Sequence, residues 1–535
     1  MPTANRQDMV RARTLSGGQF AWNSAFGTVA GLLSAVSSVA ASVIVAHALG
    51  VEETGVVAFT LWVATLVAAV VDFGIQASLA RYLPELTAAG RVDEAHRLAG
   101  ALWRWLSLTC CLAIAGFATW AWWSWQSGAI SGMDAVMWSL VGLLCAVQAL
   151  AGFTNGVLRG LQRFERVALL TIISLVCQLG GVALGSIDYG ANGAIAGYCA
   201  GSLVPAVLSL RYALPSRPPS REIRARVRRY ALYAWAAALS STFVWSRAEL
   251  FFLQRSTGSA AVGLFTVAVT LANLASQGPM LLTAGLLPYF AQSFGTGAVE
   301  KMREGYITGT RVLAFLVLPA CFGLAALLPA LLPLMYGEAF ADAVPAASVL
   351  VLAAGIGAIS SVGTSIVMAM DRSDFAFVSG LVAAVLAVAA GLTVIPAFGL
   401  MGAVWTRAAI QLVAVVMGSG FTFWRLAFPL PLFDLGRLLL SASLCGLAAR
   451  SCVALIPGPV SVVLAVAIGA VTYALSVRVL HALHPADAER LRMLCHRLPA
   501  RFGVVGDLAA GLLIPAGAGQ AGFVGAGQRS GNDGN

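Results

Sequence analysis

The chain has 535 residues, of which 59% are hydrophobic and only 10% are charged, and its formal net charge is +10. Its mean hydropathy is +0.85. So few charges cannot cover the surface of a soluble protein of this length, so the composition excludes a soluble globular fold and predicts an integral membrane protein.

Apolar runs long enough to cross a bilayer recur along the whole chain and predict an all-α polytopic membrane protein with about 14 transmembrane helices. Strands of a β-barrel would alternate over only about 10 residues. In the first half the runs cover 20–46, 56–79, 98–122, 135–158, 167–186, 191–210 and 230–253. In the second half they cover 262–288, 312–333, 344–370, 375–396, 402–424, 435–456 and 460–483.

The basic residues predict the orientation of these helices. Most of the 33 Lys and Arg residues fall in alternate loops, and the loops that carry them are expected to face the cytoplasm. Both termini are therefore predicted to be cytoplasmic, in a multi-pass protein of the cell (inner) membrane. The net positive charge follows from this topology, and no nucleic-acid partner is expected.

The two halves of the chain repeat each other. VIVAHALGVEETGVVAFT aligns with FFLQRSTGSAAVGLFTVA, which pairs Gly50 with Gly258 and Gly55 with Gly263. At almost the same offset, YGANGAIAG aligns with FGLMGAVWT and pairs Gly190 with Gly399. A duplicated unit of six helices predicts two pseudo-symmetric lobes.

The predicted domains follow from this repeat and from the Pro- and Arg-rich stretch between its copies. They are a six-helix lobe at 1–210, a basic cytoplasmic connector at 211–229, a second six-helix lobe at 230–424, two extra helices at 425–483 and a cytoplasmic tail at 484–535. The second half of the connector is predicted to form a basic amphipathic helix.

Five stretches in fixed order resemble a known family. They are AHALGVEETGVVAFTLW, VVDFGIQASLARYLPE, STGSAAVGLFTVAVTLANL, LMYGEAFADA and VIPAFGLMGAVWTRA, within about residues 20–425. The chain resembles the polysaccharide and oligosaccharide flippases, of the O-antigen type, in the multidrug/oligosaccharidyl-lipid/polysaccharide exporter superfamily. The resemblance implies alternating access and export of a lipid-linked glycan for cell-surface polysaccharide biosynthesis.

The resemblance also implies the partners. These would be a polyprenyl-diphosphate-linked glycan, membrane lipids and polysaccharide assembly proteins. We expect no cofactor, with H⁺ or Na⁺ as the candidate coupling ion, and neither a catalytic site nor a metal site, because the protein is predicted to be a transporter and not an enzyme.

Charged residues inside the predicted spans are the first candidates for the transport path, because each is costly at the bilayer centre. Arg247 suits a diphosphate, since a guanidinium offers paired donors to phosphoryl oxygens. Arg407 is a second candidate contact. Asp72 and Glu249 are candidates for ion coupling, and Asp72 is expected to share a helical face with Gln76.

A continuous seventh helix would place Arg247 on one face with Phe251, Gln254 and Arg255, and Glu249 on the other side. The two charges should therefore not pair with each other. In the repeat, Arg247 aligns with Val39 and Glu249 with Ala41, so the first lobe lacks both charges.

Further candidates complete the predicted site. Arg81 and Arg159, at cytoplasmic helix ends, would receive the head group, and Gln254, Asn155 and Asn273 would bind polar groups of the substrate. Gly278 and Pro279 should kink or break the eighth helix and act as a hinge.

Two other functions remain open. A cation-coupled drug or metabolite exporter of the same superfamily should show an excess of acidic residues in its spans. A membrane glycosyltransferase or polymerase would need a catalytic domain, for which the short loops leave no room.

Overall fold

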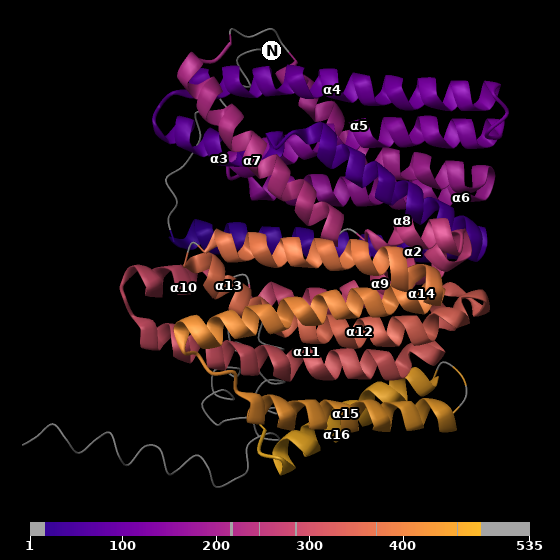
Figure 1. Cartoon of the computed structure of the whole chain (residues 1–535), viewed down its shortest axis with the longest axis vertical. Helices are drawn as coiled ribbons and strands as arrows, with labels where there is room; N and C mark the ends of the chain where they lie inside the picture. The colour runs from indigo at the N-terminus through magenta and orange to yellow at the C-terminus, as the bar shows by residue number, and fades with distance from the viewer. Residues whose placement is uncertain are drawn as a thin grey trace, which may run out of the picture. The chain divides into compact units, whose positions relative to one another are not determined.

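The computed structural model describes residues 17–213, 218–245, 247–283, 286–370, 372–456, 458 and 460–482. No strand occurs in these ranges, and Figure 1 shows long helices throughout. The predicted all-α fold is confirmed for this part of the chain. The predicted tail at 484–535 lies outside the described residues.

Contacts divide the chain into two units. Unit 1 comprises Met1–Gln277, Met335–Ala346 and Phe377–Ile410, and unit 2 comprises Gly278–Leu334, Ala347–Ala376 and Gln411–Asn535. The helices of the first half of the chain are α2 (Gly17–Asp72), α3 (Ile75–Ala88), α4 (Val92–Gln126), α5 (Gly132–Gly160), α6 (Phe164–Ser209), η1 (Leu210–Tyr212), α7 (Arg221–Trp245), α8 (Glu249–Ser256) and α9 (Ser259–Leu282). The later helices are α10 (Leu286–Gly295), α11 (Val299–Tyr336), η3 (Glu338–Ala343), α12 (Val344–Ile359), α13 (Ser361–Ala369), α14 (Ser373–Leu426), α15 (Leu432–Leu455) and α16 (Val460–Val479).

Three of these helices each hold two predicted spans. Among the described residues, ten helical segments are long and apolar enough to cross a membrane. However, α2, α6 and α14 have 56, 46 and 54 residues, whereas one crossing needs about 20. Each contains one glycine with non-helical backbone angles, namely Gly50, Gly190 and Gly399. The chain therefore turns at these glycines between consecutive predicted spans.

The backbone at matched glycines agrees with the predicted duplication. Gly190 has φ 59° and ψ −139°, and its counterpart Gly399 has φ 55° and ψ −130°. Gly50 and Gly258 also both have positive φ, at 74° and 88°. Because only glycine adopts these angles without strain, the two halves share turns that both need glycine.

Gly55 and Gly263, the second matched pair, lie against each other inside unit 1. A Cβ on Gly55 would lie 1.8 Å from the carbonyl oxygen of Ser259, and a Cβ on Gly263 would lie 2.3 Å from that of Val51. Ser259 and Val51 are themselves matched by the repeat. The contact between α2 and α9 is thus nearly reciprocal, as a pseudo-twofold relation requires, and the two backbones approach closely because neither residue has a side chain.

The second half of the predicted connector forms the start of α7, and this part is amphipathic as predicted. Ile223 and Val227, one turn apart, are each 3% exposed and belong to the same core cluster as Leu79 and Leu83 of α3. Beside this stripe, Arg226 pairs with Glu85, also of α3, at 2.9 Å. The helix therefore docks on α3 through its apolar stripe.

Further along α7, Trp235 packs against the turn that separates α2 from α3. Its indole Nε1 donates to the carbonyl oxygens of Ala69 and Val70 at 3.2 and 3.1 Å. Its ring stacks on Phe73, with centroids 4.8 Å apart and planes at 10°. Phe73 and Gly74 both have positive φ, at 47° and 70°, so the indole covers a turn in which the helical hydrogen bonds are interrupted.

We therefore expect Trp235→Ala to lower the free energy of unfolding by about 2 kcal/mol, since a half-buried indole and its hydrogen bonds are lost. Trp235→Phe keeps the stacking and should cost about half as much. Equilibrium unfolding of the purified protein in detergent measures both. Equal losses for the two variants would contradict the part assigned to ring stacking.

The seventh predicted span, 230–253, is not one continuous helix. α7 ends at Trp245 and α8 begins at Glu249, and Arg247 between them has a φ of 69°. A left-handed conformation costs an arginine on the order of 1–2 kcal/mol. The prediction that Arg247 shares a helical face with Phe251, Gln254 and Arg255 is therefore wrong, because the helix is interrupted at Arg247, whereas the other three residues lie within α8 as predicted.

Candidate functional site

A buried ion pair in unit 1 joins two of the predicted residues. Glu249 stands in the first turn of α8 and is 1% exposed, and Arg407 lies two turns beyond Gly399 in α14 and is 15% exposed. The Arg407 Nη1 atom is 3.4 and 3.5 Å from the two carboxylate oxygens of Glu249. The pair gives the costly buried carboxylate a partner.

Arg247 lies beside this pair but is not held by it. Its Nη2 atom donates to Thr270 Oγ1 of α9 over a long 3.5 Å. Among the described residues, no carboxylate lies within ion-pair distance of Arg247. Both Glu249 and Arg407 are close enough to act on it electrostatically. The sequence-based expectation that Arg247 and Glu249 do not pair is confirmed.

Hydroxyl groups complete the surroundings of Arg247. Tyr198 of α6 and Tyr336 at the end of α11 lie within electrostatic range of its guanidinium, and Tyr336 is 2% exposed. Thr270 in turn donates to the carbonyl oxygen of Thr266 at 2.8 Å. With Glu249 ionised, the buried cluster formed by Arg247, Glu249 and Arg407 carries an excess of positive charge. Such a cluster is suited to an anion that brings oxygens within reach of a guanidinium.

Asp72 has a local structural partner. It is the last residue of α2, and its Oδ1 atom accepts from the backbone N–H of Gln76 at 3.2 Å. Because the helix is interrupted at Phe73 and Gly74, Asp72 does not share a helical face with Gln76 as the sequence predicted. The carboxylate satisfies a free amide at the start of α3. Its part in ion coupling stays a prediction.

The two arginines expected at the cytoplasmic mouth are exposed. The Arg81 guanidinium lies over the ring of Tyr230, 4.5 Å from its centroid, so α3 and α7 share a cation–π contact. Arg159 stands in the last turn of α5, where a cation is favourable for the helix dipole. Neither belongs to the buried cluster, and substrate binding by either stays a prediction.

The predicted polar contacts are scattered over several helices. Gln254 of α8 donates from Nε2 to Ser259 Oγ at 3.1 Å. Asn155 is half-buried on α5, whereas Asn273 is exposed on α9, one turn after Thr270. Within the described residues, none of these three side chains is hydrogen bonded to Arg247, Glu249 or Arg407.

The predicted hinge does not break its helix at the proline. α9 continues through Gly278 and Pro279 to Leu282. The expected break therefore comes after Leu282 and not at Pro279. A hinge function of the two residues stays a prediction.

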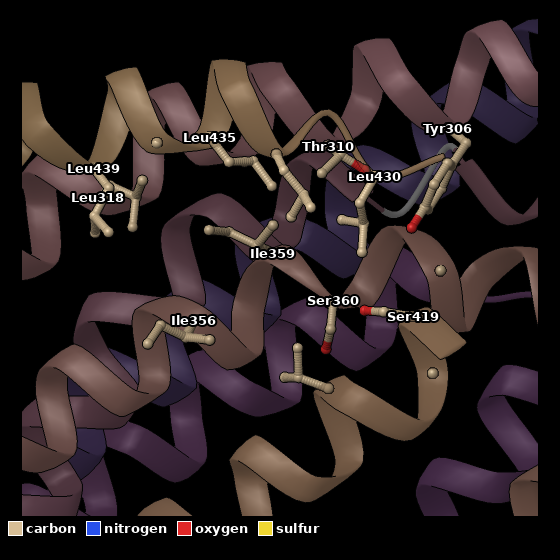
Figure 2. A pocket seen from close by; sticks show the side chains of 15 residues that line it. Tyr306, Thr310, Leu318, Ile356, Ile359, Ser360, Ser419, Leu430, Leu435 and Leu439 are labelled. Atoms are coloured by element: carbon tan, nitrogen blue, oxygen red, sulfur yellow. The ribbon is translucent and has the colours of Figure 1, made fainter. Parts of the chain in front are cut away.

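Unit 2 has an apolar pocket of about 390 Å³ that contains none of the sequence-predicted site residues. Figure 2 shows leucine and isoleucine side chains from α11, α12 and α15 around it, with the hydroxyls of Ser360 and Ser419 at one end. Tyr306, at the edge of the pocket, is hydrogen bonded to Thr422 at 3.3 Å. The pocket offers an apolar lining with few polar groups.

Sequence reasoning found the three charges of the cluster but not their arrangement. Arg407 and Glu249 are two of the few charges of opposite sign inside the predicted spans, and that was a usable signal for pairing them. Tyr198, Tyr336 and Thr270 carried no such signal, because buried hydroxyls are common in membrane helices.

Comparisons with known proteins place this geometry in a family. Residues 44–345 match the family model described as polysaccharide biosynthesis protein. A relative, the teichuronic acid biosynthesis protein TuaB of Bacillus subtilis (strain 168), is 26% identical over 194 residues. These residues make up 34% of this chain and 37% of TuaB, so the matched part spans well under half of that relative.

Solved structures share the fold. The lipid II flippase MurJ in an inward closed conformation has a TM-score of 0.64 at 13% identity, covering 86% of this chain and 98% of its own. An inward-facing multidrug resistance MATE family transporter of the MOP superfamily has a TM-score of 0.54 at 15% identity, covering 79% and 98%. Since the family model matches more than half of the chain, the protein belongs to the family of polysaccharide biosynthesis proteins, and its fold is that of MOP-superfamily transporters.

Proposed function

We propose that the protein is a flippase that moves a polyprenyl-diphosphate-linked oligosaccharide from the inner to the outer leaflet by alternating access. Arg247 carries this proposal. It lies among membrane helices beside a buried ion pair, and none of the described carboxylates lies within ion-pair distance of it. Arg247 is half-buried, and a charge that is partly removed from water without a counter-charge at contact distance is costly, so an anionic substrate that supplies the counter-charge would bind there favourably.

The diphosphate is the part of such a substrate that fits the cluster. Its oxygens can accept the paired N–H donors of a guanidinium, and the neighbouring phenols of Tyr198 and Tyr336 can donate further hydrogen bonds. Glu249, while ionised, competes for Arg407 at 3.4 Å. Glu249 is also the candidate for ion coupling, because a bound cation would compete with Arg407 for its carboxylate.

The excess of positive charge favours this function over export of a cationic drug, the alternative raised by the fold that the chain shares with a multidrug resistance MATE family transporter. Of the two acidic candidates, Glu249 forms an ion pair with Arg407, and Asp72 accepts a hydrogen bond from the backbone amide of Gln76. A cationic substrate would have to displace an arginine from Glu249, and Arg247 would repel it.

The proposal is tested with the purified protein in vesicles whose outer leaflet receives a fluorescent polyprenyl-diphosphate oligosaccharide. Movement is read from the fraction that a membrane-impermeant reagent can no longer reach. We expect protein-dependent movement of this lipid and none of a fluorescent organic cation. Transport of the cation alone would overturn the proposal.

Within that assay, Arg247→Gln should reduce the transport rate at low substrate concentration about tenfold or more, because a charge-assisted phosphate contact is lost. Arg247→Lys keeps the charge but not the paired donors, so its transport rate should lie between those of the unchanged protein and Arg247→Gln. Arg450→Gln is the matched control, since it also removes an arginine from a membrane helix but from an exposed position on α15. Equal rates for Arg247→Gln and Arg450→Gln would exclude Arg247 as the phosphate contact.

A further inference from the structure

A cavity lined by arginines lies in unit 1 and contains none of the residues of the buried cluster. It has a volume of about 230 Å³ and forms where the end of α5, the two ends of α6 and η1 meet. Three arginines line it, namely Arg163, Arg166 and Arg211, and much of the remaining lining is leucine, including Leu158, Leu169 and Leu208.

The turn between α5 and α6 brings these groups together. α5 ends at Gly160, Gln162 takes a positive φ of 56°, and α6 begins after Arg163. α6 then turns at Gly190, so that its C-terminal end and η1 come back beside its start. Thr154, 5% exposed, ties this end to α5 by donating to the carbonyl oxygen of Pro205 at 2.6 Å. The floor of the cavity is therefore a packed and hydrogen-bonded contact between two helices.

The charge of the cavity favours an anion. Three guanidiniums line a small volume, and α6 starts there without a side-chain cap, so its first amides add positive potential. Arginine is also the side chain best shaped to bind phosphoryl oxygens in pairs.

The leucines decide between a soluble anion and a lipid. Leu169 is 56% exposed, and only 17% of the most apolar window of the α6 segment is buried within the protein, so this helix faces the hydrocarbon of the bilayer. A soluble phosphate would contact the arginines but not the leucine side chains of the lining. A phospholipid would contact the arginines with its phosphate, at the membrane surface, and the leucines with its acyl chains.

We propose that this cavity binds an anionic phospholipid from the arginine-rich side of the membrane, with its phosphate held by Arg163, Arg166 and Arg211 and an acyl chain along Leu169. The bound lipid links the two ends of α6 to the end of α5. The site is separate from the proposed transport path and does not depend on it.

The test compares three probes with the purified full chain in detergent: phosphatidylglycerol, phosphatidylcholine with the same acyl chains, and glycerol 1-phosphate. Native mass spectrometry counts the bound molecules and gives their affinities. We expect phosphatidylglycerol to bind more tightly than either of the others. Binding of glycerol 1-phosphate as tight as that of phosphatidylglycerol, or equal binding of the two lipids, would overturn the proposal.

Two variants locate the site. Changing all three cavity arginines to Gln should weaken phosphatidylglycerol binding about tenfold or more, because several charge-assisted hydrogen bonds are lost. The matched control changes three exposed arginines at the start of α7 to Gln, namely Arg221, Arg228 and Arg229, and should leave the affinity within about twofold. Equal weakening in both variants would show general surface attraction and contradict a site.

Leu170→Trp tests the cavity without changing any charge. Leu170 is half-buried in the lining, so an indole there should fill the volume and weaken phosphatidylglycerol binding to a similar extent. This variant also decides the matter if the triple arginine variant does not fold. Unchanged affinity in a folded Leu170→Trp protein would place the lipid elsewhere.

Discussion

Glu249→Gln is expected to lower the free energy of unfolding by about 3 kcal/mol, because it removes one partner of a buried ion pair. The substitution keeps the size of the side chain, so packing around the 1% exposed position is preserved. It leaves the like charges of Arg247 and Arg407 within electrostatic range of each other without the nearby carboxylate. Equilibrium unfolding in detergent measures the loss.

The double variant Glu249→Gln/Arg407→Gln is the control. Replacing both charges by neutral side chains of similar length should restore most of the lost stability, since Arg407 then no longer leaves a charge without the partner that Glu249 supplied. If the double variant is no more stable than Glu249→Gln, the destabilisation comes from packing at position 249 and not from the charge.

Gly193→Ala is expected to destabilise the protein by about 3 kcal/mol, at the upper end of the range for overpacked sites. A Cβ at this position would lie 1.8 Å from the carbonyl oxygen of Gly185. That oxygen belongs to the backbone of the other arm of α6, so it can move away only if the two arms separate. Thermal unfolding of the purified protein gives the size of the effect.

Gly180→Ala is the matched control on the same helix. A Cβ on Gly180 would have no atom within 4 Å, and alanine favours the helix slightly, by up to about 1 kcal/mol over glycine. We expect this variant to be unchanged or slightly more stable. A similar loss in both variants would mean that the helix tolerates neither alanine, and that close approach of the two arms is not the cause.

The buried cluster marks the point at which the two copies of the repeat diverge. Arg247 and Glu249 align with Val39 and Ala41, which stand in an uninterrupted stretch of α2. In the second copy the helix breaks at Arg247 and the two charges enter. At Gly190 and Gly399, by contrast, the two copies keep a glycine with similar backbone angles. A local break confined to one copy, together with a net charge, is typical of a binding site added to a duplicated scaffold.

Several features could be read from the amino-acid sequence because they depend on local chemistry. Long apolar runs predict membrane helices, since each helix must satisfy its own backbone hydrogen bonds in lipid. The matched glycines at 50 and 258, and at 190 and 399, predict a duplication because glycine is needed at the same turns of both copies. The amphipathic pattern around Ile223 and Val227 likewise predicts a docked helix.

What the sequence by itself determined was thus the all-helical membrane fold, the glycines shared by the two copies of the repeat and the presence of charges within it. Only the tertiary structure decided that Glu249 pairs with Arg407, that Arg247 stands apart at a helix break, and that Asp72 binds a backbone amide. The reason is physical: a helical periodicity predicts neighbours three or four residues apart, whereas residues 249 and 407 meet only because two distant helices pack together. The charge left without a carboxylate partner, and with it the candidate site, is a property of that packing.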